Sequence, residues 1–226
     1  MQARAERERD SAKHQVSAAA INQMKPLSRL YAIADASFGD PVSLAQALFD
    51  GGARLVQVRN KKDGAGELLR QVERILALAP PDGLVIVNDR VDVARIAGAA
   101  GVHLGQSDLP VRAARPILGP DRIVGLSTHN LDQALEADKL PVDYVAVGPV
   151  FPTASKENAE PVVGIDNLAV ICQSIRKPVV AIGGIKIEDA HRVLRAGARS
   201  IAVISDLLNS RDIPARVKAW SELLGV

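Results

Sequence analysis

A short unit recurs along this chain from Leu30 onward. Each copy has a turn of small residues, a brief apolar run that ends in a polar residue, and then a stretch with apolar residues at helical spacing. A run of this kind predicts a strand, and the helical spacing predicts a helix after it. Strands that alternate with helices indicate a parallel sheet. The predicted strands lie within residues 31–34, 51–57, 84–87, 100–105, 123–126, 141–148, 179–182 and 196–204.

Eight such strands, each followed by a stretch that can form a helix, are the number needed for a closed (β/α)8 barrel, the TIM barrel. The chain has 226 residues, 47% of them hydrophobic, which suits one core. We therefore predict an α/β protein with a single TIM barrel over residues 26–226, its last helix ending near Trp220. Residues 1–25 have mixed charge and a run of alanines, and we expect a flexible tail or a frayed helix there. A doubly wound open sheet is the alternative, because periodicity does not show closure.

The composition restricts the classes of partner. Lys and Arg number 28 against 26 Asp and Glu, so the net charge of +2 gives no broad basic field for nucleic acid or a membrane surface. A single cysteine, Cys172, and the absence of an apolar stretch of about 20 residues fit a reducing, cytoplasmic setting. We expect small molecules as partners, no nucleic acid and no membrane, and the sequence is compatible with a homo-oligomer.

The segment 57–61 reads Gln-Val-Arg-Asn-Lys and continues one of the predicted strands. Because alternate side chains of an extended chain face the same side, Gln57, Arg59 and Lys61 converge on one surface. Arg and Lys are the usual ligands of phosphate and diphosphate groups. The segment therefore predicts one wall of an anion site, at the carboxyl ends of the strands, where such barrels place their catalytic groups.

Two carboxylates follow neighbouring predicted strands. Asp89 comes after the third strand and Asp108 after the fourth, so both are expected at one rim, facing the cations of the segment 57–61. Mg²⁺ takes one or two carboxylates together with waters and phosphate oxygens, so the pair predicts a magnesium site that a diphosphate completes. The plainer interpretation makes Asp89 a helix N-cap and Asp108 a turn residue before Pro110.

A glycine pair, Gly183 and Gly184, follows the seventh predicted strand, and the eighth leads into a helix-forming segment near Asp206. Backbone N–H groups in loops of this kind hold phosphate in many barrels, so we expect a second, monophosphate-like anion site here. Glycines of an ordinary tight turn are the alternative. Two anion sites on one rim predict that two small phosphorylated substrates meet between them.

Five ordered motifs carry a resemblance to a known family. They are Gln57-Val-Arg-Asn-Lys61, Val87-Asn-Asp-Arg-Val-Asp92, Gly101-Val-His-Leu-Gly-Gln-Ser-Asp108, Gly148-Pro-Val-Phe-Pro-Thr-Ala-Ser-Lys156 and Ala181-Ile-Gly-Gly-Ile185. Together they resemble the thiamine phosphate synthases, collinearly from about Leu30 to Ala202. The resemblance implies a Mg²⁺-dependent transferase that joins 4-amino-2-methyl-5-hydroxymethylpyrimidine diphosphate to 4-methyl-5-(2-hydroxyethyl)thiazole phosphate, or its carboxylated form, and yields thiamine phosphate and diphosphate.

The resemblance also implies roles for individual residues. Those that would bind the pyrimidine diphosphate are Gln57, Arg59, Lys61, Asn88, Ser127 and Lys156. Those that would bind the thiazole phosphate are Thr153, Ser155, Gly184, Ile204 and Ser205. Asp89 and Asp108 would hold Mg²⁺. The family mechanism is dissociative, with diphosphate leaving before the thiazole nitrogen attacks, and the residues expected to act in catalysis are Arg59, Lys61, Ser127 and Lys156.

Two positions depart from the family pattern. Asn60 stands where Glu is frequent, and its side chain should point away from the barrel interior. Ser155 stands where Thr is usual and keeps the hydroxyl group. We expect neither change to abolish binding.

Two other functions stay open at this point. A barrel that resembles thiazole tautomerase would use the same thiazole phosphate without a diphosphate partner, but the segments 105–108 and 152–156 argue against it. A non-catalytic barrel that binds phosphorylated metabolites is the second, because fold alone does not determine function. His103 is expected to point inward, as a buried structural histidine rather than a proton-transfer group.

Overall fold

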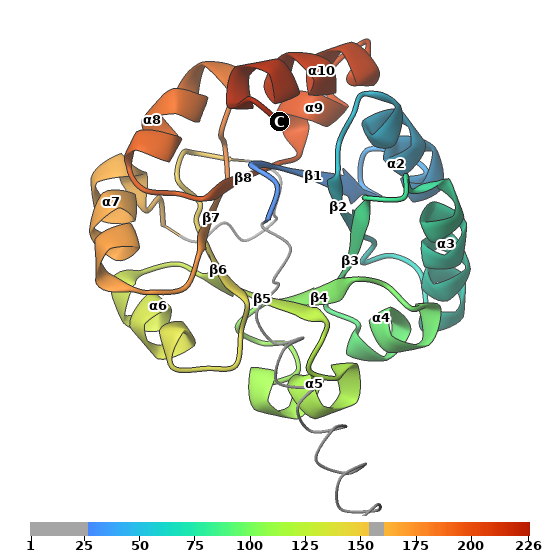
Figure 1. The fold of residues 1–226 in the computed structure, drawn as a ribbon, viewed down its shortest axis with the longest axis horizontal. Helices are drawn as coiled ribbons and strands as arrows, with labels where there is room; N and C mark the ends of the chain where they lie inside the picture. The colour runs from blue at the N-terminus through green and yellow to red at the C-terminus, as the bar shows by residue number, and fades with distance from the viewer. Residues whose placement is uncertain (1–26, 154–160) are drawn as a thin grey trace, which may run out of the picture.

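The computed structural model describes residues 27–153 and 161–226. Over these residues eight parallel strands close into one barrel in the order of the sequence (Figure 1). The predicted TIM barrel is confirmed, and the predicted tail over residues 1–25 lies outside the described residues. The strands are β1 (Leu30–Asp35), β2 (Leu55–Arg59), β3 (Leu84–Asn88), β4 (Gly101–Leu104), β5 (Ile123–Thr128), β6 (Tyr144–Val147), β7 (Val179–Ile182) and β8 (Ser200–Val203).

Closure of the sheet rests on the pairing of its first and last strands. β1 pairs with β8 in parallel, from Leu30 opposite Ile201 to Ala32 opposite Val203. Each of the eight strands is therefore hydrogen-bonded on both sides. This pairing excludes the doubly wound open sheet, in which the two outer strands would be edges.

Helices form a ring around the barrel (Figure 1). They are α2 (Pro41–Asp50), α3 (Ala65–Leu78), α4 (Val91–Ala97), α5 (Val111–Leu118), α6 (Leu131–Asp138), α7 (Gly164–Ser174), α8 (Ala190–Arg195), α9 (Ser205–Leu208) and α10 (Ile213–Leu224), with a 3-10 turn, η1 (Ile187–Asp189), before α8. Side-chain caps mark several starts: Asp40, Asn130 and Asp212 each accept a backbone N–H of the first turn. The last helix runs past Trp220 to Leu224 because the residue suited to ending it is Gly225, which has a φ of 68°.

The barrel wall is buried on both faces, as in other parallel sheets. Along β2, for example, Val56 and Val58 face the helices, whereas Leu55 and Gln57 face the barrel interior. This alternation divides the core into an outer layer between sheet and helices and an inner layer within the barrel. The buried apolar residues of the inner layer are Leu27, Tyr31, Ile33, Leu55, Ile86, Tyr144, Ala146, Val180 and Ala202.

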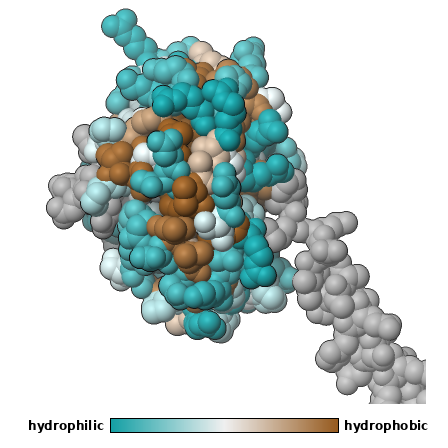
Figure 2. Space-filling view, turned by 90° about the vertical axis from the view of Figure 1, so that its left-hand side faces the viewer, coloured by the Kyte–Doolittle hydropathy of each residue, from teal (hydrophilic) through white to brown (hydrophobic). Residues whose placement is uncertain are grey.

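Apolar residues also reach the surface on the side of the barrel formed by α6, α7 and α8, where Figure 2 shows them among hydrophilic side chains. The large exposed apolar residues of this part of the chain are Leu135, Val162 and Val170. Within the described ranges, none of the helices combines the length and the apolar character that crossing a membrane requires. That the chain is compatible with a homo-oligomer stays a prediction.

Candidate active site

The carboxyl ends of the strands surround a cavity of about 360 Å³. Side chains from all eight strands line it, so the cavity reaches from the mouth into the barrel interior. Among its lining are the predicted site residues Gln57, Arg59, Lys61, Asn88, Asp89, Asp108, Ser127, Thr153, Gly184, Ile204 and Ser205. Ser155 and Lys156 lie outside the described residues. Every predicted site residue that the structure describes therefore belongs to one cavity.

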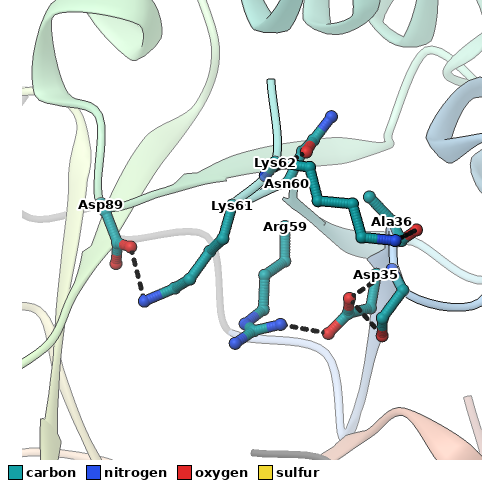
Figure 3. A network of polar contacts seen from close by, with 8 residues as sticks. Asp35, Ala36, Arg59, Asn60, Lys61, Lys62 and Asp89 are labelled. Carbon is teal, nitrogen blue, oxygen red and sulfur yellow. Dashed lines mark hydrogen bonds and ion pairs between the residues drawn. The ribbon is translucent and has the colours of Figure 1, made fainter. Parts of the chain in front are cut away.

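The Arg59 guanidinium is held against the end of β1. Its Nη1 donates to Asp35 Oδ2 at 2.5 Å, because the register of the two strands places these residues opposite each other (Figure 3). Asp35 is only 2% exposed. The pair fixes one cation at the wall of the cavity, as the sequence predicts for Arg59.

Lys61 extends toward the loop after β3. Its Nζ lies 3.0 Å from Asp89 Oδ2, and Figure 3 shows the two side chains pointing toward each other. The next residue, Lys62, turns to the opposite side and donates to the carbonyl oxygen of Ala36 at 3.2 Å. Asn60 likewise points outward, toward Gln71 of α3. The predicted alternation along this segment is confirmed.

Asp89 has an unusual backbone conformation. Among the described residues it is the one non-glycine with a positive φ, 62°. Its N–H donates to the carbonyl oxygen of His103, and the Arg90 N–H donates to that of Asn88, so a tight turn is held on both sides. Such a conformation is costly for a residue with a β-carbon, and it persists where the surroundings enforce it. The N-cap interpretation is wrong, since the N-cap of α4 is Arg90 and no side chain caps this helix.

The Asp108 carboxyl lies beside that of Asp89. Burial raises the pKa of Asp89, a hydrogen bond with Asp108 raises it further, and the contact with Lys61 opposes the shift. Asp108 Oδ2 also accepts the Gly105 N–H at 2.6 Å, so the plainer interpretation of Asp108 as a turn residue is confirmed, and its role as a magnesium ligand stays a prediction. Two carboxyl groups thus share one small, partly buried space.

This donor set suits a hard divalent cation. The set has only two members, because the described residues contain no group of three or more His, Cys, Asp or Glu side chains that could hold a metal ion. Two carboxylates that repel each other favour a divalent ion that draws its remaining ligands from water and phosphate oxygens. The residues that would hold Mg²⁺ are Asp89 and Asp108.

A chain of hydrogen bonds crosses the floor of the cavity. Gln57 Nε2 donates to the Tyr31 hydroxyl at 2.9 Å, and this hydroxyl lies 3.0 Å from that of Tyr144. The Tyr144 hydroxyl is 2.9 Å from His103 Nδ1, and His103 Nε2 is 2.9 Å from Ser127 Oγ. This chain of hydrogen bonds connects Gln57 with Ser127, two residues to which the family resemblance gives the same expected ligand.

The aromatic members of this chain are buried and closely packed. Burial raises the pKa of both Tyr31 and Tyr144, so their hydroxyl groups stay protonated. The Tyr144 ring stacks on His103 and meets Tyr31 edge-on, with centroids 5.7 Å and 6.0 Å apart. Gly125 leaves room for it, since a β-carbon there would lie 2.0 Å from Tyr144 Cζ. His103 is buried and hydrogen-bonded as predicted, whereas no local sequence signal identified the two tyrosines.

The glycine pair after β7 has positive φ values, 97° at Gly183 and 67° at Gly184. A β-carbon on Gly184 would lie 2.5 Å from the Pro152 carbonyl oxygen, and one on Gly183 would lie 2.5 Å from Pro149 Cα. The pair therefore serves first to let the chain after β6 pack against the end of β7. Gly184 still lines the cavity, together with Thr153, Ile204 and Ser205, at the place expected for the second anion.

A closed (β/α)8 barrel with cations and a carboxylate pair at the carboxyl ends of its strands is typical of barrel enzymes whose substrates carry phosphate groups. Residues 30–207 match the family described as thiamine monophosphate synthase. The chain belongs to this family, and the resemblance of its motifs is confirmed.

Curated relatives named thiamine-phosphate synthase support the same family. One from Koribacter versatilis (strain Ellin345) is 48% identical over 80% of this chain and 90% of its own length. Another, from Coprothermobacter proteolyticus, is 44% identical over 89% of this chain and 97% of its own.

Solved structures agree with the fold. A thiamine phosphate pyrophosphorylase from Pyrococcus furiosus superposes with a TM-score of 0.80 at 36% identity, covering 87% of this chain and 95% of that one. A 3-hexulose-6-phosphate synthase, with a TM-score of 0.64 at 18% identity over 87% of this chain and 99% of that one, is similar in fold alone.

Replacing Tyr144 by Phe removes the hydroxyl that joins Tyr31 to His103. Because buried polar groups then lose a partner, we expect the free energy of unfolding to fall by about 1–3 kcal/mol. Urea unfolding at neutral pH measures the change. A loss below about 0.3 kcal/mol, well under the usual net value of a hydrogen bond, would contradict a stabilising role for the chain of hydrogen bonds.

Replacing Asp89 by Asn should stabilise the metal-free protein at neutral pH. The pKa of Asp89 is raised by burial and by Asp108, so its ionisation lowers stability as the pH rises above the usual carboxyl range. The gain in melting temperature should therefore shrink as the pH falls toward the usual carboxyl pKa, about 3.9. Melting curves in EDTA between pH 4 and 7.5 measure this dependence.

The matched control for that experiment is Asp92→Asn. Arg90 lowers the pKa of Asp92, so ionisation stabilises the fold there and the variant should be slightly less stable at neutral pH. A destabilised Asp89→Asn variant across the whole pH range would show that its carboxylate is well accommodated without a metal.

Proposed function

We propose that this chain is a magnesium-dependent transferase that synthesises thiamine phosphate. Its substrates are 4-amino-2-methyl-5-hydroxymethylpyrimidine diphosphate and 4-methyl-5-(2-hydroxyethyl)thiazole phosphate or its carboxylated form. The observation that carries the proposal is the placement of the carboxylate pair, Asp89 and Asp108, beside Lys61 and in one cavity with Arg59. Membership of the thiamine monophosphate synthase family and the names of the relatives support it.

The two substrates would occupy different sides of the cavity. Gln57 and Ser127, at the ends of the buried hydrogen-bond chain, would contact the pyrimidine, and Asn88, the last residue of β3, lines the same cavity. Arg59 and Lys61, with Lys156, would bind the diphosphate. The residues assigned to the thiazole phosphate are Thr153, Ser155, Gly184, Ile204 and Ser205, of which the described ones line the side of the cavity formed by the loops after β6, β7 and β8.

The reaction requires no nucleophilic side chain. The bond between the pyrimidine methylene carbon and the diphosphate oxygen breaks first, and diphosphate leaves with the electron pair. The lone pair of the thiazole nitrogen then forms a bond to the methylene carbon, and the positive charge moves to the thiazolium ring. With the carboxylated thiazole phosphate, the carboxyl group also leaves as CO2. Arg59, Lys61 and Lys156 would stabilise the departing diphosphate, while the barrel wall aligns the two rings.

Mg²⁺ fits this scheme as a counter-ion. When bound by Asp89 and Asp108, it would neutralise charge on the diphosphate oxygens. The chain supplies two carboxylates and leaves the remaining positions to the phosphate groups and water. Lys61, which contacts Asp89 in the structure, is near enough to bind the same diphosphate.

Neither rival function explains the carboxylate pair. A thiazole tautomerase handles no diphosphate, and the strained Asp89 turn beside Asp108 would then have no ligand to hold. A non-catalytic phosphate-binding barrel would need the cations but not two adjacent carboxyl groups, which repel the anion. The pair therefore favours the transferase.

The test is release of diphosphate by the full chain given both substrates and Mg²⁺, with EDTA and single-substrate controls. We expect release to require both substrates and the metal. Release without the thiazole phosphate would indicate a hydrolase. The absence of release, with the thiazole phosphate still bound, would favour the tautomerase or the non-catalytic barrel.

Asp108→Asn tests the carboxylate pair directly. The amide oxygen can still accept the Gly105 N–H and the contact with Asp89 loses a charge, so we expect no fall in melting temperature. Turnover should fall by at least about a hundredfold, because metal-assisted charge stabilisation contributes several kcal/mol. Diphosphate release at saturating Mg²⁺ measures the loss. The control Asp92→Asn, at a residue outside the cavity lining, should release diphosphate at the rate of the unsubstituted protein. Equal losses of stability and activity would contradict the assigned role.

A further inference from the structure

Asp35 is a buried, charged residue to which the proposed reaction assigns no role. It ends β1, is 2% exposed, and does not line the cavity. One carboxylate oxygen, Oδ1, accepts the N–H of Ser37 at 2.9 Å and its hydroxyl at 2.8 Å. The other, Oδ2, accepts Arg59 Nη1 at 2.5 Å (Figure 3). A carboxylate removed from water in this way persists only with strong partners, and here it has a cation and two further donors.

Arg59 has more donors than this contact uses. A guanidinium carries five N–H groups in a rigid plane, and one nitrogen is committed to Asp35. In the described part of the chain no other hydrogen bond or ion pair of the guanidinium is found. Its side chain is 16% exposed and lines the cavity, so the remaining donors face the space where an anion would bind.

We propose that Asp35 is a positioning residue that orients the Arg59 guanidinium for diphosphate. The inference rests on the proposed function and adds a residue that acts only through Arg59. The register of β1 and β2 places Asp35 opposite Arg59, and the Ala36 N–H donates to the Arg59 carbonyl oxygen at 2.9 Å. Backbone and side chain of Arg59 are thus both held from β1, which lowers the entropy lost when the anion binds.

Two effects of Asp35 on an anion have opposite signs. Its negative charge alone repels diphosphate, so removing only that charge would strengthen diphosphate binding. Its hold on Arg59 favours binding, and a displacement of about 1 Å in a positioning group can cost about a hundredfold. The direction of the change in affinity therefore distinguishes a positioning residue from a mere countercharge.

Asp35→Asn is the variant that tests this inference. Asn has one acceptor oxygen in place of two, so it cannot serve both Ser37 and Arg59, and its amide group places a donor against one of them. We expect the dissociation constant of inorganic diphosphate, measured by calorimetry with Mg²⁺ on the full chain, to rise about tenfold or more. The turnover number should fall as well.

A double-mutant cycle separates positioning from other effects. In the Arg59→Met background, Asp35→Asn should change diphosphate affinity less than about twofold, because the group it positions is absent. Additive effects of the two substitutions, or unchanged or tighter diphosphate binding by Asp35→Asn alone, would overturn the inference.

Asp143→Asn is the matched control. Asp143 also pairs with an arginine, Arg115 at 2.6 Å, and also accepts a backbone N–H, from Val124, but it lies at the opposite end of the barrel, just before β6. This variant should lose stability and keep diphosphate affinity unchanged. If Asp35→Asn does not fold, Ser37→Ala provides the second variant. It removes the hydroxyl donor to Asp35 Oδ1 and keeps the backbone N–H donor, so the carboxylate is held less firmly and diphosphate binding should weaken about threefold.

Failure of this inference differs from failure of the proposed function. If the unsubstituted chain releases diphosphate from both substrates and Asp35→Asn binds it equally well, only the role of Asp35 is wrong. If the unsubstituted chain releases no diphosphate, the proposed function is wrong.

Discussion

Parallel closure of the barrel through β1 and β8 is the constraint on which the site depends. Because all eight strands run in the same direction, their carboxyl ends surround a single mouth. Residues as distant in sequence as Asp35 and Ser205 are therefore neighbours of one cavity or of its wall. In an open sheet the first and last strands would be separate edges, and the two anion sites would have no common space.

The charges at this mouth are arranged for a ligand more than for stability. Asp89 has a strained backbone and a raised pKa, Asp108 lies against it, and a half-exposed lysine, Lys61, gives only partial compensation. Charges placed in this way lower the stability of the empty site, which is a common property of catalytic centres. By contrast, one nitrogen of the Arg59 guanidinium is bonded to a buried partner, Asp35, so the position of this cation does not depend on the ligand.

Local periodicity was enough to predict the strands and the cation wall, because alternation along one strand decides which side chains share a face. The same holds for Asp89 and Asp108, which follow adjacent strands. The contact of Asp35 with Arg59 depends instead on the register between strands, and so do the hydrogen bonds that connect Gln57 with Ser127. Register is a property of the closed barrel and leaves no local trace in the sequence, so Asp35, Tyr31 and Tyr144 were not predicted as parts of the site.

The central claim of this account is that the carboxylate pair and a diphosphate hold one divalent ion together. Titration of Mn²⁺, followed by its electron paramagnetic resonance signal, with and without inorganic diphosphate, tests it most directly. The account predicts weak binding by the protein alone and tight binding when diphosphate is present, with the gain lost in Asp89→Asn. Equal Mn²⁺ affinity with and without diphosphate, or a gain that survives in that variant, would contradict it.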